Sequence, residues 1–179
     1  MTATNWTINT NQSDVLLKTK RHENKYLVSN YSAFDGSIAI KDDMLEDASV
    51  AFLLAVNPNI QDSKNYKDIS VWDKVLKSEQ PLTISFKSTS FQKINSNINF
   101  IKGYLTINNI TKVVELDAVL TELKTNNGES KAVFEIFGDI NRKEFELTNS
   151  NQKNLDFLNI GGKINLTANL EFTNTTIIN

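Results

Sequence analysis

A regular alternation of apolar and polar residues constrains the fold of this chain more than any other feature. From Ile164 to Phe172 every second residue is apolar, and the residues between them are polar or charged. A β-strand places these two sets on opposite faces, whereas a helix would mix them. Residues 114–120 repeat the alternation, and residues 134–140 do so with additional apolar groups on the second face. The pattern predicts strands with one face in a core and the other in water.

Further short strands are separated by residues that favour turns. Their number and spacing predict an all-β, antiparallel meander that closes on itself as a barrel. Neither an internal repeat nor a linker interrupts the chain, so one domain over residues 1–179 is expected. The other predicted strands are residues 14–20, 25–29, 37–41, 82–88 and 98–107, and the predicted turns are Asp35-Gly36, Asn57-Pro58, Asn108-Asn109, Asn126-Asn127-Gly128 and Gly161-Gly162.

One predicted strand, residues 48–56, is apolar on both faces. A barrel wall buries one face of each strand, so the second face needs a cover. A short covering helix is predicted between Asp62 and Gln80, where apolar residues recur at helical spacing before Pro81. This helix either lies against the barrel or forms a lid over a ligand mouth. The alternative cover is the same strand of a second subunit in a homodimer.

The composition excludes several classes of function. The formal net charge is −2, so the basic surplus typical of a nucleic-acid-binding protein is missing. With no cysteine and a single histidine, His22, the chain lacks the residues for thiol catalysis, disulfides or a Cys/His metal site. No window approaches the roughly 18 apolar residues of a membrane span, and no secretory leader is recognisable. A cytoplasmic protein without cofactors is therefore expected.

Six short motifs follow one another along the chain in a recognisable order. They are Trp6-Thr-Ile-Asn9, Phe34-Asp-Gly-Ser-Ile38, Ala48-Ser-Val50, the segment 81–89, the segment 101–114 and Ile140-Asn-Arg-Lys-Glu-Phe145. Their order and spacing resemble those of the YceI-like family. The similarity runs from about Trp6 to Phe172, which is nearly the whole chain.

The resemblance implies an eight-stranded antiparallel, lipocalin-like barrel with an elongated apolar tunnel. It also implies the binding of polyisoprenoids or other amphipathic lipids, with no established catalysis, in proteins that are often dimeric and often periplasmic. The chain departs from the family pattern at Gln12-Ser13, where His-Ser is common. It departs again at Glu146, where a glycine usually follows the phenylalanine of the last motif.

Large apolar residues on the predicted strands are the candidates for lining a ligand cavity. An eight-stranded barrel is just wide enough to be filled by side chains or to hold one small ligand, and both outcomes stay open. Trp6 and Arg142 are expected to stack and plug one barrel end, with pairing of Arg142 to a lipid head group as the alternative. The cavity candidates are Phe52, Leu54, Phe86, Phe100, Leu116, Phe134, Phe137, Leu166 and Leu170.

These observations predict a non-catalytic protein that binds or carries elongated apolar or amphipathic lipids. The alternative is a ligand-free, filled barrel that acts as an interaction or oligomerisation module, and an enzyme of unassigned chemistry is a distant third. The carboxylates of Glu135 and Asp139 would lie roughly 13 Å apart along one strand. That separation suits neither geometry of a glycosidase, so solvated charges on the outer face are expected.

Overall fold

The computed structural model describes residues 4–21, 25–31, 34–41, 44–56, 82–95, 98–147 and 160–175, and for β3 and β5 it describes the backbone alone. Within these ranges the chain is almost entirely β-structure. The elements are β1 (Thr4–Ile8), the 3-10 turn η1 (Thr10–Gln12), β2 (Asp14–Arg21), β3 (Lys25–Tyr31), β4 (Phe34–Lys41), β5 (Met44–Val56), β6 (Leu82–Lys93), β7 (Ile98–Ile107), β8 (Ile110–Asn126), β9 (Glu129–Asn141) and β10 (Ile160–Thr175).

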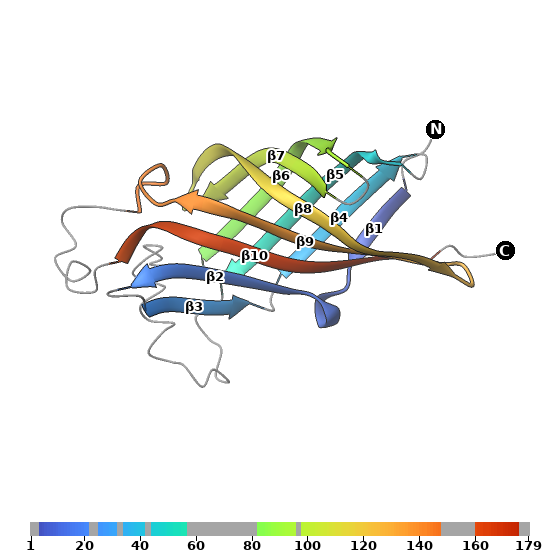
Figure 1. Ribbon diagram of the computed structural model, residues 1–179, viewed down its shortest axis with the longest axis horizontal. Helices are drawn as coiled ribbons and strands as arrows, with labels where there is room; N and C mark the ends of the chain where they lie inside the picture. Colours follow the sequence, from blue (N-terminus) through green and yellow to red (C-terminus); the bar gives the residue numbers. More distant parts are fainter. Residues whose placement is uncertain are drawn as a thin grey trace.

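The strands form one antiparallel sheet that curls until its first and last strands meet. Its order is β1-β4-β5-β6-β7-β8-β9-β10-β2-β3, and β1 also pairs with β10. The eight strands β1 and β4 to β10 therefore make a ring (Figure 1), which confirms the predicted eight-stranded barrel. The closing seam is short among the described residues, where Thr7 pairs with Thr173 and Ile8 with Phe172.

The hairpin of β2 and β3 continues the wall along the same edge of β10. β1 pairs with the C-terminal end of β10, and β2 pairs with residues nearer its start. Between them, η1 stays attached: the Asn9 N–H donates to the Glu171 carbonyl at 2.7 Å, and the Glu171 N–H donates to Ser13 Oγ at 2.8 Å. β10 thus holds β1, η1 and β2 along the edge opposite to β9.

The core fills the inner side of the curled sheet, as the alternation predicts. Along β7, buried residues alternate with exposed ones over almost its whole length. Phe134 packs edge-on against Phe91 and Phe172, with ring centroids 6.1 and 6.2 Å apart. Edge-to-face aromatic pairs of this kind contribute about 0.5–1.5 kcal/mol each beyond the area that they bury.

Several predicted elements fall as expected and others do not. β7 has the predicted bounds, and Asn108-Asn109 and Asn127-Gly128 form hairpin turns with positive φ values of 49°, 65°, 49° and 84° in chain order. The predicted turns at Asp35-Gly36 and Gly161-Gly162 are wrong, because these pairs lie inside β4 and β10. The helix predicted between residues 62 and 80, the turn at 57–58 and His22 lie outside the described residues. In the parts of the chain that are described, no helix is long and apolar enough to cross a membrane.

Candidate functional site

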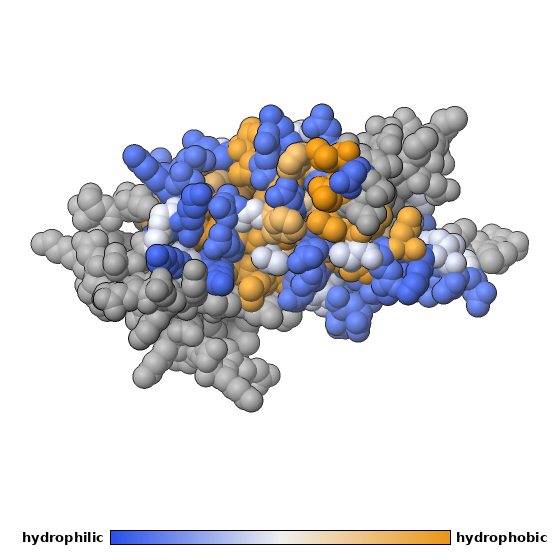
Figure 2. Space-filling model, viewed as in Figure 1, coloured by the Kyte–Doolittle hydropathy of each residue, from blue (hydrophilic) through white to orange (hydrophobic). Residues whose placement is uncertain are grey.

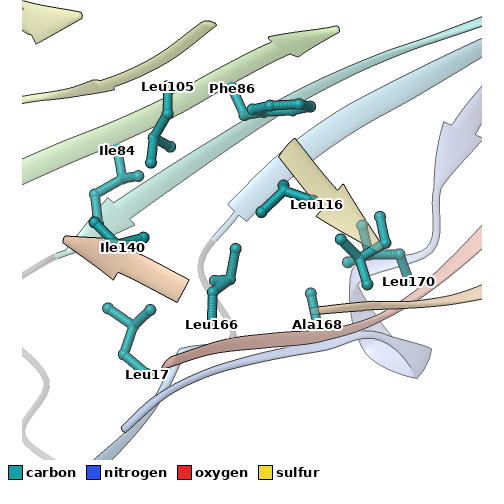
Figure 3. Close-up of a pocket in the computed structure, with 10 residues that line it drawn as sticks. Leu17, Ile84, Phe86, Leu105, Leu116, Ile140, Leu166, Ala168 and Leu170 are labelled. Carbon is teal, nitrogen blue, oxygen red and sulfur yellow. The ribbon is translucent and has the colours of Figure 1, made fainter. Parts of the chain in front are cut away.

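The inner side of the barrel contains a small cavity, and all the described residues that line it are apolar. Six strands contribute to it, and their side chains converge from opposite walls (Figure 3). Its free volume is about 30 Å³, more than the roughly 10–15 Å³ that a single buried water needs. The side chains that line it are Leu17, Ile84, Phe86, Leu105, Leu116, Ile136, Ile140, Leu166, Ala168 and Leu170.

Two glycines leave room for the side chains of Phe86 and Leu116. A β-carbon on Gly103 would come within 2.6 Å of the Phe86 Cζ atom, and it would also meet the Lys87 carbonyl oxygen. A β-carbon on Gly138 would lie 2.5 Å from the Leu116 Cδ2 atom. Phe86 and Leu116 therefore lie across neighbouring strands where no side chain competes with them. The shape of the cavity depends on these two side chains.

Four of the predicted cavity residues line the cavity in the structure: Phe86, Leu116, Leu166 and Leu170. Phe134 is fully buried but belongs to the aromatic cluster beside the cavity rather than to its lining. For Phe52 and Leu54 the structure gives only the backbone, which pairs with that of Phe86 and of Ile84 across β5 and β6.

Two predicted cavity residues, Phe100 and Phe137, point away from the interior. Their side chains are 43% and 37% exposed, respectively. Their direct neighbours Ile101 and Ile136 are buried, so the alternation of β7 and β9 assigns the inner face to the isoleucines. The prediction favoured the bulkier residue of each pair, and for these two it was wrong.

The remaining lining residues were not predicted. They are aliphatic, and each lies at an inward position of an alternating strand. The alternation of inward and outward positions along each strand could have identified them. Residue size could not. The residues are Leu17, Ile84, Leu105, Ile136, Ile140 and Ala168.

Trp6 and Arg142 lie at opposite ends of β10, so the predicted stacked pair is wrong. Trp6 is next to Thr7, whose partner on β10 is Thr173. The backbone N–H of Arg142, by contrast, donates to the carbonyl of Gly162 on β10. Eleven residues of extended strand separate those two positions of β10, roughly 36 Å at about 3.3 Å per residue. Both side chains are nevertheless buried, with exposed fractions of 6% for Trp6 and 5% for Arg142.

The Arg142 guanidinium is held by backbone carbonyl groups. Nη1 donates to the Gly161 carbonyl at 3.1 Å and Nη2 to the Leu147 carbonyl at 2.8 Å. Its Nε–H is buried and has no hydrogen-bond partner in the described part of the chain. Burial lowers the pKa of the guanidinium below its usual value, because desolvation disfavours the charged form.

An open groove of about 690 Å³ lies on the outer side of β8, β9 and β10. Phe137 lines it together with four carboxylates, those of Glu115, Asp117, Glu135 and Asp139. Asp139 accepts a hydrogen bond from the Asn165 amide and pairs with Lys163 at 3.4 Å. No group of three or more His, Cys, Asp or Glu side chains among the described residues is arranged to hold a metal ion.

Residues 6–172 match the YceI-like domain family. The chain belongs to the YceI-like family. This assignment confirms the resemblance that the motifs suggested. No significant match to the chain was found among curated proteins.

Solved structures with the same fold share little sequence with this YceI-like chain. BcnA from Burkholderia cenocepacia is 15% identical with a TM-score of 0.70, over 92% of this chain and 98% of that one. A YceI protein from Campylobacter jejuni is 20% identical with a TM-score of 0.69, over 87% and 90% of the two chains. A polyisoprenoid-binding domain from Saccharophagus degradans implicated in plant cell wall breakdown is 9% identical with a TM-score of 0.61, over 93% and 97%.

Proposed function

We propose that this YceI-like chain binds an elongated apolar or amphipathic lipid inside its barrel and acts as a carrier rather than a catalyst. The observation that carries the proposal is the cavity lining, in which all ten residues are apolar. The described part of this wall is suited to hydrocarbon and presents no acid, base or nucleophile. The similarity to a polyisoprenoid-binding domain supports a polyisoprenoid as the first candidate ligand.

Desolvation of the ligand supplies the driving force. Each buried methylene contributes about 0.8 kcal/mol, so a chain of roughly ten methylenes needs no specific hydrogen bond to bind. A free volume of about 30 Å³ is far smaller than such a chain. Ligand entry must therefore displace inner side chains. Phe86 and Leu116 are the candidates, because they lie over Gly103 and Gly138, which have no side chains of their own.

The matched substitutions Ala168→Leu and Thr167→Leu test this proposal. Ala168 lines the cavity, whereas Thr167 is its neighbour on the outer groove. Added bulk at Ala168 should lower the affinity for a long-chain isoprenoid alcohol at least about tenfold, because it takes the space of the ligand. Added bulk at Thr167 should leave the affinity unchanged. Equal affinities for the two folded variants would place the ligand outside the barrel.

A second candidate function is an interaction or oligomerisation module whose barrel is filled by its own side chains. The small free volume favours it, and so does the set of exposed apolar residues on the outer side. Figure 2 shows apolar groups gathered near the middle of one face, bordered by polar ones. The exposed apolar residues of β7, β8 and β9 in this set are Ile98, Phe100, Tyr104, Val113, Leu123 and Phe137.

Native mass spectrometry of protein purified from its own host separates the two candidates. A co-purifying lipid that dissociates on activation supports the carrier. A ligand-free mass that corresponds to a homodimer supports the module and contradicts the carrier.

A further inference from the structure

Arg142 places a buried positive charge at one end of the cavity wall. It follows Ile140, a lining residue, by two positions, and both are buried while Asn141 between them is exposed. Arg142 directly follows the last residue of β9, and the alternation of buried and exposed residues continues through it. Its backbone is fixed there, because its N–H donates to the Gly162 carbonyl at 2.9 Å and its carbonyl accepts from the Leu147 N–H at 2.8 Å.

The hydrogen bonds of the guanidinium leave part of its donor capacity unused. Arginine has five N–H donors, and two of them meet the carbonyls of Gly161 and Leu147. The buried Nε–H has no partner among the described residues, and none of the carboxylates described forms an ion pair with Arg142. A buried charge without a counter-ion and a buried donor without an acceptor both disfavour the folded state.

The two carbonyl bonds give Arg142 a structural role, but they account for neither the buried Nε–H nor the charge. An apolar side chain would seal the end of the barrel without burying a charge. Arginine adds a rigid, planar fork, in which Nε and the adjacent Nη present two parallel N–H groups. That fork matches the two oxygens of a carboxylate or phosphate.

We propose that Arg142 binds the anionic head group, a carboxylate or a phosphate, of an amphipathic ligand whose apolar chain lies in the barrel. This inference rests on the proposed lipid-binding function and narrows it to anionic amphiphiles. The apolar wall that ends at Ile140 takes the chain of the ligand, and the fork of Arg142 neutralises its charge where the wall ends.

Three probes with the same apolar chain and different heads test the inference: farnesol, farnesoic acid and farnesyl phosphate. Wild-type protein should bind at least one of the two anions about tenfold or more tightly than farnesol, since a charge-assisted hydrogen bond is stronger than a neutral one. A preference for the acid alone identifies a carboxylate head, and a preference for the phosphate alone identifies a phosphate head. Arg142→Gln should remove the preference and keep the affinity for farnesol. Lys143→Gln removes a charge from the exposed neighbouring residue and should keep the preference.

Nuclear magnetic resonance on the wild-type protein tests the same contact even where Arg142→Gln fails to fold. The chain has two arginines, Arg21 and Arg142, so Arg21→Lys assigns the remaining Nε–H signal. The preferred anion should shift that signal, and farnesol should not. Equal affinities for the three probes, or an unmoved Nε–H signal, overturn the role of Arg142 and leave the lipid-binding proposal intact. Failure of the folded protein to bind any of the three probes overturns the proposed function itself, and the role of Arg142 with it.

Discussion

At the scale of single residues, Glu146 adopts a backbone conformation that suits glycine. Its φ is 53°, in the left-handed region, where a β-carbon costs about 1–2 kcal/mol. Glycine, which the resemblance to the YceI-like pattern leads us to expect here, adopts this conformation without that cost. Glu146→Gly should raise the free energy of unfolding by about 1 kcal/mol in urea denaturation. Lys143→Gly, in the same turn but without a positive φ, should lower it; a less stable Glu146→Gly protein would show that the turn is not strained.

Gly103 is the residue on which the position of Phe86 depends. Gly103→Ala forces a β-carbon against the Phe86 ring and the Lys87 carbonyl oxygen, and overpacking of this kind costs typically about 1–3 kcal/mol. Gly162→Ala is the matched control, because a β-carbon added there would meet no atom within 4 Å. Thermal unfolding should show a lower Tm for the first variant and an unchanged Tm for the second. An unchanged Tm in both would mean that Phe86 moves without cost.

At the scale of elements, an ion network ties the hairpin of β8 and β9 to β10. Lys131 Nζ lies 3.0 Å from Glu122 Oε2 and 3.3 Å from Glu171 Oε2, and Lys124 also pairs with Glu122. Hydrogen bonds from Lys124 and then Lys131 hold the pKa of Glu122 below its usual 4.5. A lowered carboxyl pKa stabilises the folded state above pH 4.5, and this stabilisation is lost as the pH falls through the lowered value.

Amide protection factors across the tip of this hairpin should therefore decrease as the pH falls below about 4.5. Hydrogen exchange, corrected for the intrinsic rate at each pH, measures the effect. Glu122→Gln should have lower protection at neutral pH and a weaker dependence on pH. A variant with the wild-type pH profile would assign the effect to other carboxylates.

Among the elements, the hairpin turns are the ones that the sequence predicts well. Asn-Asn and Asn-Gly pairs mark hairpin turns because asparagine and glycine tolerate positive φ, and both turns form where expected. The turn predicted at Gly161-Gly162 was wrong because glycine also occurs at irregularities inside strands, and the register of β10 shifts between Ile160 and Ile164. An isolated glycine pair does not distinguish these two roles.

Bulges also limit how well inward residues can be predicted. In β6 the buried residues are Ile84, Phe86 and Ser88, and after the irregularity at Ser88 and Ser90 the buried residue is Phe91. The phase changes from even to odd numbers within one strand. Alternation in the sequence gives the fold class and most of the inner wall, but the positions of such phase changes arise from pairing with the neighbouring strand. The same holds for the separation of Trp6 from Arg142, which depends on the register of β1 with β10.

At the scale of the whole molecule, the sequence of residues 48–56, apolar at both sets of alternating positions, remains the basis for a predicted homodimer. β5 lies between β4 and β6 in the sheet, so its backbone edges are both paired and only a face is left for a second subunit. Leu53→Glu should convert a dimer that uses this face into a folded monomer in sedimentation analysis, because an unpaired carboxylate buried in an interface is strongly disfavoured. Wild-type protein that sediments as a monomer contradicts the dimer. A mutant that unfolds instead of dissociating assigns Leu53 to the core of its own subunit.

The short seam between β1 and β10 has a consequence for the order in which the molecule is made. Asn9 and Glu171, which bond side by side at this seam, are 162 positions apart in the chain. At about 5–20 residues per second, a ribosome needs roughly 8 to 30 seconds to synthesise the residues between them. The ring cannot close until β10 has emerged, so β1, whose other edge pairs with β4, waits with its β10 edge unpaired while the meander from β4 to β9 assembles. Closure is thus a late folding step that joins the two most distant parts of the sequence, and slow folding is the expected result of such long-range pairing.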